Sequence, residues 1–261
     1  MTNLTTTHVV FFSPTRTSER VVRAIAEGIG MERRIETDLT VDLDDSPIEI
    51  NNSLTILAVP VYGGRVAPVA AQRMRRLKSN GSPVILVAVY GNRDYEDALV
   101  ELRDIAVEAG FKPLSAGAFI GEHSFSTAQY PTAVGRPDDN DLDVARKFGT
   151  DSAKKINEAG DALSDLVIKG NVPYKDLKPS QPVSPVSTDD CSGCGSCIDV
   201  CPTHAIEMNE SCDGVVTDAQ LCIKCCACVK TCPISARVFD TPFSAILFEK
   251  CSARREPELF L

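Results

Sequence analysis

The chain has 261 residues, of which 43% are hydrophobic and 24% are charged, and its formal net charge is -9. This composition is typical of a globular protein and excludes an intrinsically disordered chain, and the length fits one large domain or two smaller ones. The net negative charge argues against nucleic acid as a partner, because proteins bind nucleic acids chiefly by neutralising phosphates with lysine and arginine.

The start of the chain and its apolar runs argue against export and against a membrane span. Residues 1–12 lack the basic start, the apolar stretch and the small-residue cleavage site of a secretory signal. The longest strongly apolar run, residues 84–90, is about a third of the length that a membrane-spanning helix needs. We therefore expect a cytoplasmic protein.

The first part of the chain, residues 1–165, alternates short apolar runs with helical patterns. The apolar runs predict strands at residues 8–12, 54–61, 83–90 and 113–120, and residues 33–38 are a further strand candidate. The helical patterns lie at residues 18–28, 67–78, 97–109 and 143–159. Runs that are apolar throughout are typical of parallel strands buried on both faces. The alternation predicts an α/β fold with a doubly wound parallel five-stranded sheet, which would bind ligands at the carboxyl ends of its strands.

The loop after the first expected strand is rich in hydroxyl groups. Ser13, Thr15, Thr17 and Ser18 surround Arg16 where a helix is expected to begin. Hydroxyls and free backbone N–H groups at a helix N-terminus form an anion site. The same residues could equally serve as a helix N-cap, so this stretch alone leaves both interpretations open.

Two further loops follow the strands at 54–61 and 83–90 and should emerge at the same edge of the sheet. They read PVYGGR at residues 60–65 and YGNRDY at residues 90–95. Glycine lets backbone N–H groups approach a planar ring, and tyrosine can stack on such a ring. Each tyrosine taken alone could instead be a rim residue that packs on its neighbours.

With these three loops, residues 5–160 resemble the flavodoxin-like fold, in which a Ser/Thr-rich loop binds the phosphate of FMN and two other loops sandwich the isoalloxazine ring. The family pattern T/S-x-T-G-x-T/S has glycine where this chain has Arg16. A left-handed conformation there would cost arginine on the order of 1–2 kcal/mol, which the guanidinium could partly offset by facing the phosphate. The resemblance implies an FMN site made of Ser13, Thr15, Arg16, Thr17, Ser18, Pro60, Val61, Tyr62, Gly63, Gly64, Tyr90, Gly91, Asn92, Arg93 and Tyr95.

The stretch between the last expected strand and the last expected helix, residues 121–141, is long for a loop, and such loops are often functional. We expect it to border the flavin, with Glu122 and Arg136 as candidates for substrate or partner contact. His123 and Tyr130 are candidates for the same contacts and for catalytic residues. The alternative is a solvated surface loop with an ordinary histidine.

Residues 166–185 are rich in proline, which is typical of an extended and fairly stiff linker. They precede a cysteine-rich domain at residues 186–240 and a C-terminal extension at residues 241–261. We expect the end of that extension, residues 249–261, to form a helix that docks back on the body of the protein.

All eleven cysteines follow residue 190, and eight of them form two runs. Residues 191–202 read CSGCGSCIDVCP and residues 222–233 read CIKCCACVKTCP, so that two C-x2-C-x2-C-x3-C-P runs lie 31 residues apart. They resemble the small α+β bacterial 2[4Fe-4S] ferredoxins, in which the fourth cysteine of each run ligates the other cluster. The resemblance assigns Cys191, Cys194, Cys197 and Cys232 to one cluster, and Cys222, Cys225, Cys228 and Cys201 to the other.

Zinc is the alternative metal, but zinc sites usually combine two separated CxxC pairs. Three cysteines remain outside the two sets, namely Cys212, Cys226 and Cys251. Cys226 stands where the first run has Gly195, and it is either a small buried filler or a spare, regulatory thiol.

Taken whole, the chain resembles the fusion proteins of flavodoxin and ferredoxin that are called EFR-type ferrodoxins in anaerobes. The stretches PVYGGRVAP, YGNRDYEDAL and GRPDDNDL carry this resemblance. It implies an electron-transfer iron–sulfur flavoprotein that shuttles low-potential electrons between [4Fe-4S] clusters and FMN for a separate redox partner. Two alternatives stay open: a flavin-dependent reductase of its own quinone, nitro or enone acceptor, and a binding or sensory module that lacks FMN. The chain could act as a monomer or as a homodimer.

Overall fold

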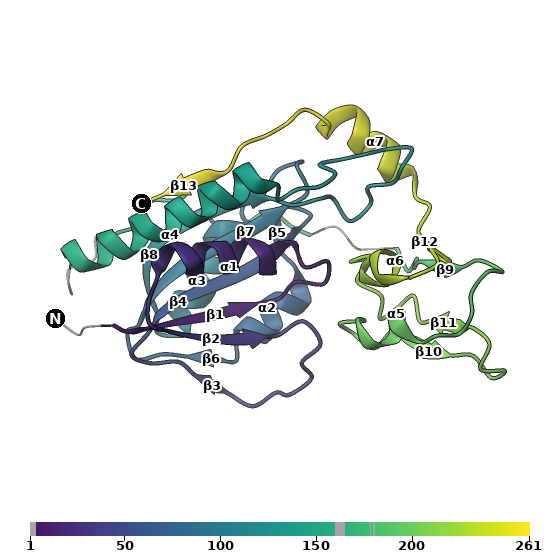
Figure 1. The fold of residues 1–261 in the computed structure, drawn as a ribbon, viewed down its shortest axis with the longest axis horizontal. Helices are drawn as coiled ribbons and strands as arrows, with labels where there is room; N and C mark the ends of the chain where they lie inside the picture. The colour runs from purple at the N-terminus through teal and green to yellow at the C-terminus, as the bar shows by residue number, and fades with distance from the viewer. Residues whose placement is uncertain (1–3, 160–164, 178, 180) are drawn as a thin grey trace.

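The computed structural model describes residues 4–159, 165–177, 179 and 181–261. The first half of the chain forms a doubly wound sheet with helices on both faces (Figure 1). Its five parallel strands are β1 (Thr6–Phe11), β2 (Arg33–Asp38), β4 (Leu54–Tyr62), β7 (Pro83–Tyr90) and β8 (Lys112–Ile120). They pair in the order β2-β1-β4-β7-β8, which is the 2-1-3-4-5 order of flavodoxin-like sheets. The predicted fold class is therefore confirmed.

The apolar runs explain why both faces of the sheet are covered. The covering helices are α1 (Thr17–Ile29), α2 (Pro68–Met74), α3 (Ala98–Glu108) and α4 (Asp139–Ala159). Val9 and Phe11 are buried in the core that α1 and α4 share with the sheet. Val10 and Phe12 are buried in the core on the side of α2 and α3. Because successive side chains of a strand point to opposite faces, a continuously apolar strand fills both cores.

Two expected elements differ from the structure. The helix expected at residues 67–78 ends at Met74, and Leu77–Lys78 instead form β6, which pairs with β3 (Ile48–Glu49). The helix expected at residues 249–261 is also wrong: α7 (Pro242–Cys251) ends early in that segment, and β13 (Glu258–Phe260) pairs antiparallel with β8. Both short strands depend on a pairing partner far away in the sequence, which local periodicity does not reveal.

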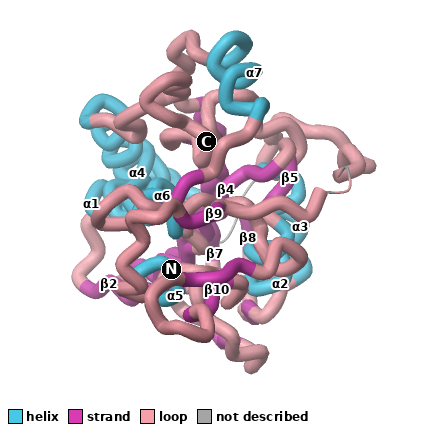
Figure 2. Tube along the Cα trace, turned by 90° about the vertical axis from the view of Figure 1, so that its right-hand side faces the viewer, coloured by secondary structure: helices cyan, strands magenta, loops and turns pink. Residues whose placement is uncertain are grey.

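The cysteine-rich part is a small α+β unit, seen in front of the sheet in Figure 2. Its elements are β9 (Val186–Ser187), α5 (Ser196–Asp199), β10 (Ile206–Met208), β11 (Val215–Thr217), α6 (Ala227–Thr231) and β12 (Arg237–Val238). β10 pairs with β11 and β12 pairs with β9, both antiparallel. Within the described residues, no helix has the length and apolar character that a membrane crossing requires.

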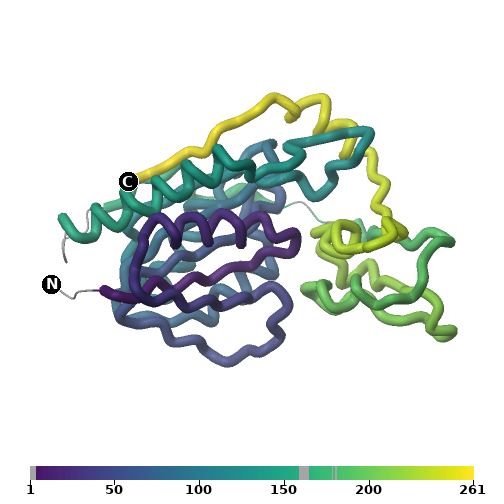
Figure 3. The backbone as a smooth tube through the Cα atoms, viewed as in Figure 1, coloured from purple at the N-terminus to yellow at the C-terminus, as the bar shows by residue number. Residues whose placement is uncertain are grey.

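The cysteine-rich part lies beyond the carboxyl ends of the parallel strands (Figures 1 and 3). An ion pair between Lys230 of α6 and Glu122, which follows β8, connects the two parts. The rings of Phe125 and Phe239 contact edge to face, with 5.3 Å between their centroids. The edge of the sheet where ligands bind in such folds therefore faces the cysteines.

Part of the proline-rich stretch is bound to the first domain at the start of α3. The Asp97 carboxylate accepts hydrogen bonds from the backbone N–H groups of Asn171 and Lys175, each at 2.8 Å. The Arg65 guanidinium stacks over the Tyr174 ring, 4.5 Å from its centroid. These contacts hold residues 171–175 against the sheet domain.

Candidate cofactor sites

The loops at the carboxyl ends of β1, β4, β7 and β8 surround one cavity of about 220 Å³. It lies at the edge where the sequence predicts the FMN site. Ten of its lining residues belong to the predicted FMN set: Ser13, Thr15, Thr17, Ser18, Pro60, Val61, Tyr62, Gly63, Tyr90 and Gly91. The other lining residues are Pro14, Val89, Gly121, Glu122, His123, Ser124, Phe125, Ile223 and Lys224.

The hydroxyl-rich loop makes the helix-capping contact that its sequence left open as one of two alternatives. Ser13 caps the helix, because its Oγ accepts a hydrogen bond from the Glu19 N–H group at 3.1 Å. Ser18 lies in the first turn of α1 and is fully buried, and its Oγ has no hydrogen-bond partner among the described residues. Since buried polar groups are nearly always paired, this hydroxyl in the cavity wall indicates that a polar ligand belongs beside it.

Arg16, which stands where the family pattern has glycine, adopts the left-handed conformation with φ of 62°. Its backbone N–H donates to the Ser13 carbonyl oxygen at 3.0 Å and closes the turn. The Arg16 side chain is 76% exposed and lies 3.3 Å from Glu19, and it does not line the cavity. In this structure the guanidinium therefore faces Glu19 and solvent rather than the place expected for a phosphate.

The second and third loops contribute two tyrosines to the cavity. The hydroxyl of Tyr90 is buried without a partner among the described residues, and burial raises its pKa to about 12. Burial also raises the pKa of Tyr62, with a further contribution from the neighbouring cysteines 222, 225 and 226. Both phenols are therefore neutral at physiological pH and can contribute an apolar face to a ring.

Several residues of the predicted FMN set lie outside the cavity and stabilise other contacts. Tyr95 is fully buried and donates its hydroxyl hydrogen to Glu258 of β13 at 2.6 Å. The Asn92 amide donates to the carbonyl oxygens of Cys251 and Ala253, and Arg93 pairs with Glu96. Gly64, with φ of 86°, is also not among the lining residues. The distal half of the YGNRDY loop thus holds the C-terminal segment, which sequence alone did not suggest.

His123 lies in the cavity wall as expected. Its Nδ1 accepts a hydrogen bond from the Phe125 N–H group at 3.0 Å, which places the proton of the neutral ring on Nε2. Burial, with smaller contributions from the charges of Arg93 and Lys230, lowers the pKa of His123 to about 4. A Cβ on Gly91 would approach the His123 Cδ2 to 2.4 Å, so glycine is required for this packing.

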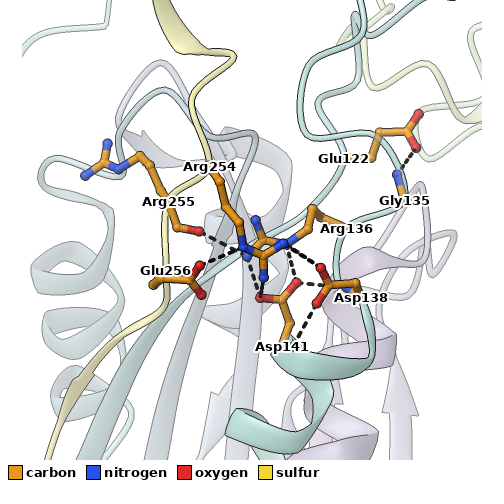
Figure 4. A network of polar contacts seen from close by, with 8 residues as sticks. All are labelled: Glu122, Gly135, Arg136, Asp138, Asp141, Arg254, Arg255 and Glu256. Atoms are coloured by element: carbon orange, nitrogen blue, oxygen red, sulfur yellow. Dashed lines mark hydrogen bonds and ion pairs between the residues drawn. The ribbon is translucent and has the colours of Figure 1, made fainter.

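Tyr130, expected to act beside the flavin, is not among the residues that line the cavity. Its ring lies 6.3 Å from that of Phe248 in α7. Arg136, a candidate for substrate or partner contact, is also not among the lining residues. It is buried and forms an ion pair with the Asp141 carboxylate (Figure 4). Its Nη2 also donates to the Arg255 carbonyl oxygen at 3.1 Å, so Arg136 fastens the C-terminal segment to the start of α4.

The eight cysteines of the two runs separate into two cavities. The first is lined by Cys191, Cys194, Cys197 and Cys232, and the second by Cys201, Cys222, Cys225 and Cys228. In each cavity three cysteines come from one run and the fourth from the other, as the ferredoxin resemblance implies. Two corresponding N–H groups point at sulfur: Ala205 N–H lies 3.3 Å from Cys201 Sγ, and Ala236 N–H lies 3.2 Å from Cys232 Sγ.

The four cysteines of each cavity suit a cluster better than a single ion. Among the described residues, no group of three or more His, Cys, Asp or Glu side chains is close enough to hold one metal ion. A four-iron cube needs a wider space between its thiolates than zinc does. The four-cysteine donor sets therefore fit [4Fe-4S] binding.

The second cysteine cavity adjoins the cavity of the sheet domain. Ile223, between the first two cysteines of its run, lines both cavities. Lys224 also lines the sheet-domain cavity, and its Nζ donates to the Gln181 carbonyl oxygen at 2.6 Å. Local patterns of the sheet domain do not indicate these two residues, because they belong to the other domain.

The three remaining cysteines have different surroundings. Cys226 is buried in the wall of the second cysteine cavity with φ of 59°, as Gly195 has φ of 77° at the matching position. Cys212 is exposed and Cys251 is half-buried. Cys226 is therefore the buried one of the three, and it adopts the left-handed conformation that glycine adopts in the first run.

The comparisons with known proteins match the cysteine-rich part. The family model of the 4Fe-4S binding domain matches residues 185–207. The B subunit of polysulfide reductase from Wolinella succinogenes is 38% identical over 64 residues, which are 24% of this chain and 31% of that protein. A probable ferredoxin of Methanosarcina thermophila is 51% identical over 35 residues, which are 13% of this chain and 57% of that protein. The chain thus spans less than two thirds of the length of either curated relative.

Solved structures resemble the sheet domain. A flavodoxin from the domain Archaea is 13% identical, with a TM-score of 0.38 over 58% of this chain and 99% of that one. The Fusobacterium nucleatum flavodoxin bound to flavin mononucleotide is 17% identical, with a TM-score of 0.38 over 59% of this chain and 97% of that one. These TM-scores are too low to carry an argument. The fold is therefore defined by the strand order of the sheet. The chain joins a flavodoxin-like parallel α/β domain to a 4Fe-4S ferredoxin domain.

Proposed function

We propose that the chain carries electrons between an FMN held in the sheet-domain cavity and two [4Fe-4S] clusters, and exchanges them with a separate redox protein. The observation that carries this proposal is the wall shared through Ile223 by the FMN cavity and the second cysteine cavity. Bound FMN accepts one or two electrons, and each cluster transfers one at a time. The protein itself supplies position and surroundings for this exchange.

The sheet-domain cavity has the groups that FMN requires. The hydroxyls of Thr15, Thr17 and Ser18 and the N-terminus of α1 are suited to the phosphate. Tyr62 and Tyr90 are neutral rings suited to contact the isoalloxazine. The unpartnered Ser18 hydroxyl is the clearest sign that a polar ligand binds here.

The two clusters would differ in their access to solvent. In the first set Cys194 is exposed, whereas in the second set Cys201, Cys225 and Cys228 are all buried. The second set adjoins the flavin cavity through Ile223. We therefore place the second cluster beside FMN and the first cluster where a partner protein can reach it.

All eleven cysteines are free, which fits a reducing compartment. We propose that the protein works in the cytoplasm of an anaerobic cell, where exposed clusters escape oxidation. Its oxidised clusters would add about two negative charges each to a chain that already has a net charge of -9, which favours a partner with a basic docking surface.

Anaerobic reconstitution with counts of iron, sulfide and flavin tests the proposal. We expect two four-iron clusters and one FMN per chain, and reduction of the clusters by dithionite should be followed by reduction of FMN. The variant Cys225→Ser should lose the second cluster and slow flavin reduction, whereas Cys212→Ser, at an exposed cysteine outside both sets, should do neither. A chain that takes up both clusters but no flavin would instead support a binding or sensory module.

One observation favours a second function, a flavin-dependent reductase. One wall of the cavity carries both polar and aromatic groups. It is formed by His123, Ser124 and Phe125 of the sheet domain. A quinone, nitro or enone acceptor beside the flavin would contact this wall. Steady turnover of such acceptors by the loaded protein with dithionite as reductant, lost in the variant Phe125→Ala, would support the enzyme rather than the carrier.

A further inference from the structure

Arg237 of β12 is a buried cation inside the ferredoxin domain. The residue is only 3% exposed. Its guanidinium donates to the Ser187 Oγ at 3.0 Å, to the Pro185 carbonyl oxygen at 3.0 Å and to the Thr217 Oγ1 at 2.8 Å. Its Nε is buried without a hydrogen-bond partner among the described residues.

No carboxylate among the described residues forms an ion pair with Arg237. None of the ion pairs formed by the described residues includes it, and its hydrogen-bond acceptors are two hydroxyls, a carbonyl and a thiol sulfur. An isolated buried charge is strongly unfavourable unless an opposite charge lies nearby. The chain therefore needs an anion close to this guanidinium.

The position of Arg237 identifies the candidate anions. Arg237 lines the first cysteine cavity, and its Nη2 lies 3.9 Å from the Sγ of Cys228, which lines the second. The guanidinium thus lies between the two sets of ligands.

The internal repeat does not explain this arginine. Arg237 lies five residues after Cys232, and the residue five positions after Cys201 is Ile206, which is buried in the ferredoxin core. In the first run an aliphatic side chain thus fills the position that corresponds to Arg237. Packing alone therefore does not explain why this position carries a positive charge.

We propose that Arg237 is the counter-charge shared by the two clusters, and that it raises the reduction potential of both. This inference rests on the proposed function, because it requires two clusters in the two cavities. Each cluster becomes one charge more negative when it is reduced, so a fixed positive charge between them favours the reduced form of each. Because Arg237 favours the reduced form of each cluster, it would also help both clusters to be reduced together before the flavin receives two electrons.

The test is a redox titration of the reconstituted full chain, followed by visible absorbance and by electron paramagnetic resonance. Arg237→Gln removes the charge and keeps hydrogen-bonding groups. We expect it to lower the reduction equilibrium constant of both clusters about tenfold, which is about 59 mV for a one-electron couple. Arg237→Lys keeps the charge and should shift both constants much less.

Ser187→Ala is the matched control, because it removes one partner of the guanidinium and keeps its charge. Arg237→Gln with full iron content and unchanged potentials would overturn the inference, as would Ser187→Ala with an equal shift. If Arg237→Gln fails to assemble, Arg237→Met removes the charge without burying an amide, and the same shift is expected. A wild-type chain with a single cluster would refute the proposed function itself, whatever the variants do.

Discussion

Arg73 of α2 donates a hydrogen bond from Nη2 to the carbonyl oxygen of Pro202, 2.7 Å away, and so joins the sheet domain to the turn after the fourth cysteine of the first run. Its Nη1 donates to the carbonyl oxygens of Leu39 and Thr40 at 2.8 and 2.5 Å. The guanidinium is buried and stacks over Phe12, 5.5 Å from the ring centroid. One side chain thus connects the loop after β2, the core and the ferredoxin domain.

Arg73→Met should destabilise the protein and loosen the contact between its two domains. Methionine fills the space but leaves three carbonyl oxygens without this donor, and we expect a loss of about 3 kcal/mol in the free energy of unfolding. Thermal unfolding of the loaded protein measures it. The exposed neighbour Arg75 provides the control, since Arg75→Met should change stability by less than about 0.5 kcal/mol. Equal effects of the two substitutions would contradict the role given to Arg73.

Ser18→Ala should have opposite effects on stability and on flavin binding. The buried hydroxyl lacks a partner among the described residues, so its removal should leave the flavin-free chain as stable as before or slightly more stable. A hydrogen bond to a phosphate contributes about 1.5–3 kcal/mol, so FMN affinity should fall about tenfold or more. Thermal unfolding and quenching of FMN fluorescence measure the two effects. Unchanged FMN affinity would exclude this hydroxyl from the phosphate site.

Ser13→Ala is the control for Ser18→Ala in the same loop. The Ser13 Oγ caps the Glu19 N–H group, so its loss should lower the stability of the flavin-free chain by about 1 kcal/mol. A stabilising effect of Ser13→Ala would show that the cap contributes little in solution.

Arg16→Gly should retain FMN binding and stabilise the chain by on the order of 1 kcal/mol, because glycine adopts φ of 62° without the strain of a Cβ. The guanidinium faces Glu19, so its loss should not affect the cavity. Arg16→Ala removes the same guanidinium and keeps the strain, and is therefore the matched control. If both variants lost FMN affinity to the same extent, the guanidinium would have to contact the phosphate after all.

The buried His123 should make the protein less stable in acid. Its pKa is lowered to about 4 in the folded state from about 6.5 in the unfolded chain, so the unfolded state binds more protons between these values and stability falls as pH falls. We expect a loss of about 2 kcal/mol between about pH 7.5 and pH 5 that is absent in His123→Gln. The difference between the two proteins in denaturant unfolding at each pH isolates this effect. If the free energy of unfolding depended on pH in the same way in both proteins, the His123 side chain would have to be exposed to solvent.

Local sequence patterns predicted the parts of the site that depend on strand ends. The loops at residues 13–18 and at residues 60–63 could be located because apolar runs end there, and parallel strands bring their carboxyl ends together. The two cysteine sets could be assigned because the repeated run fixes the exchange of the fourth ligand.

The rest of the candidate site depends on contacts between segments that are far apart in the sequence. Asn92 and Tyr95 looked like flavin residues because they follow a glycine after a strand, but they bind the C-terminal segment. Tyr130 belongs to a loop that turns towards α7 instead of the cavity. Ile223 reaches the cavity from another domain, and no periodicity of the sheet domain could indicate it.

The pairing of β13 with β8 also makes the ferredoxin domain an insertion rather than an appendage. The chain leaves the sheet domain after α4 and returns to the same sheet with its last residues (Figure 3). A single proteolytic cut near the exposed Val183 would therefore leave two fragments that still share a sheet, held further by the Tyr95–Glu258 hydrogen bond. Two attachments limit how far the clusters can move from the flavin cavity, and so they keep the donor and the acceptor of the proposed transfer at a fixed distance.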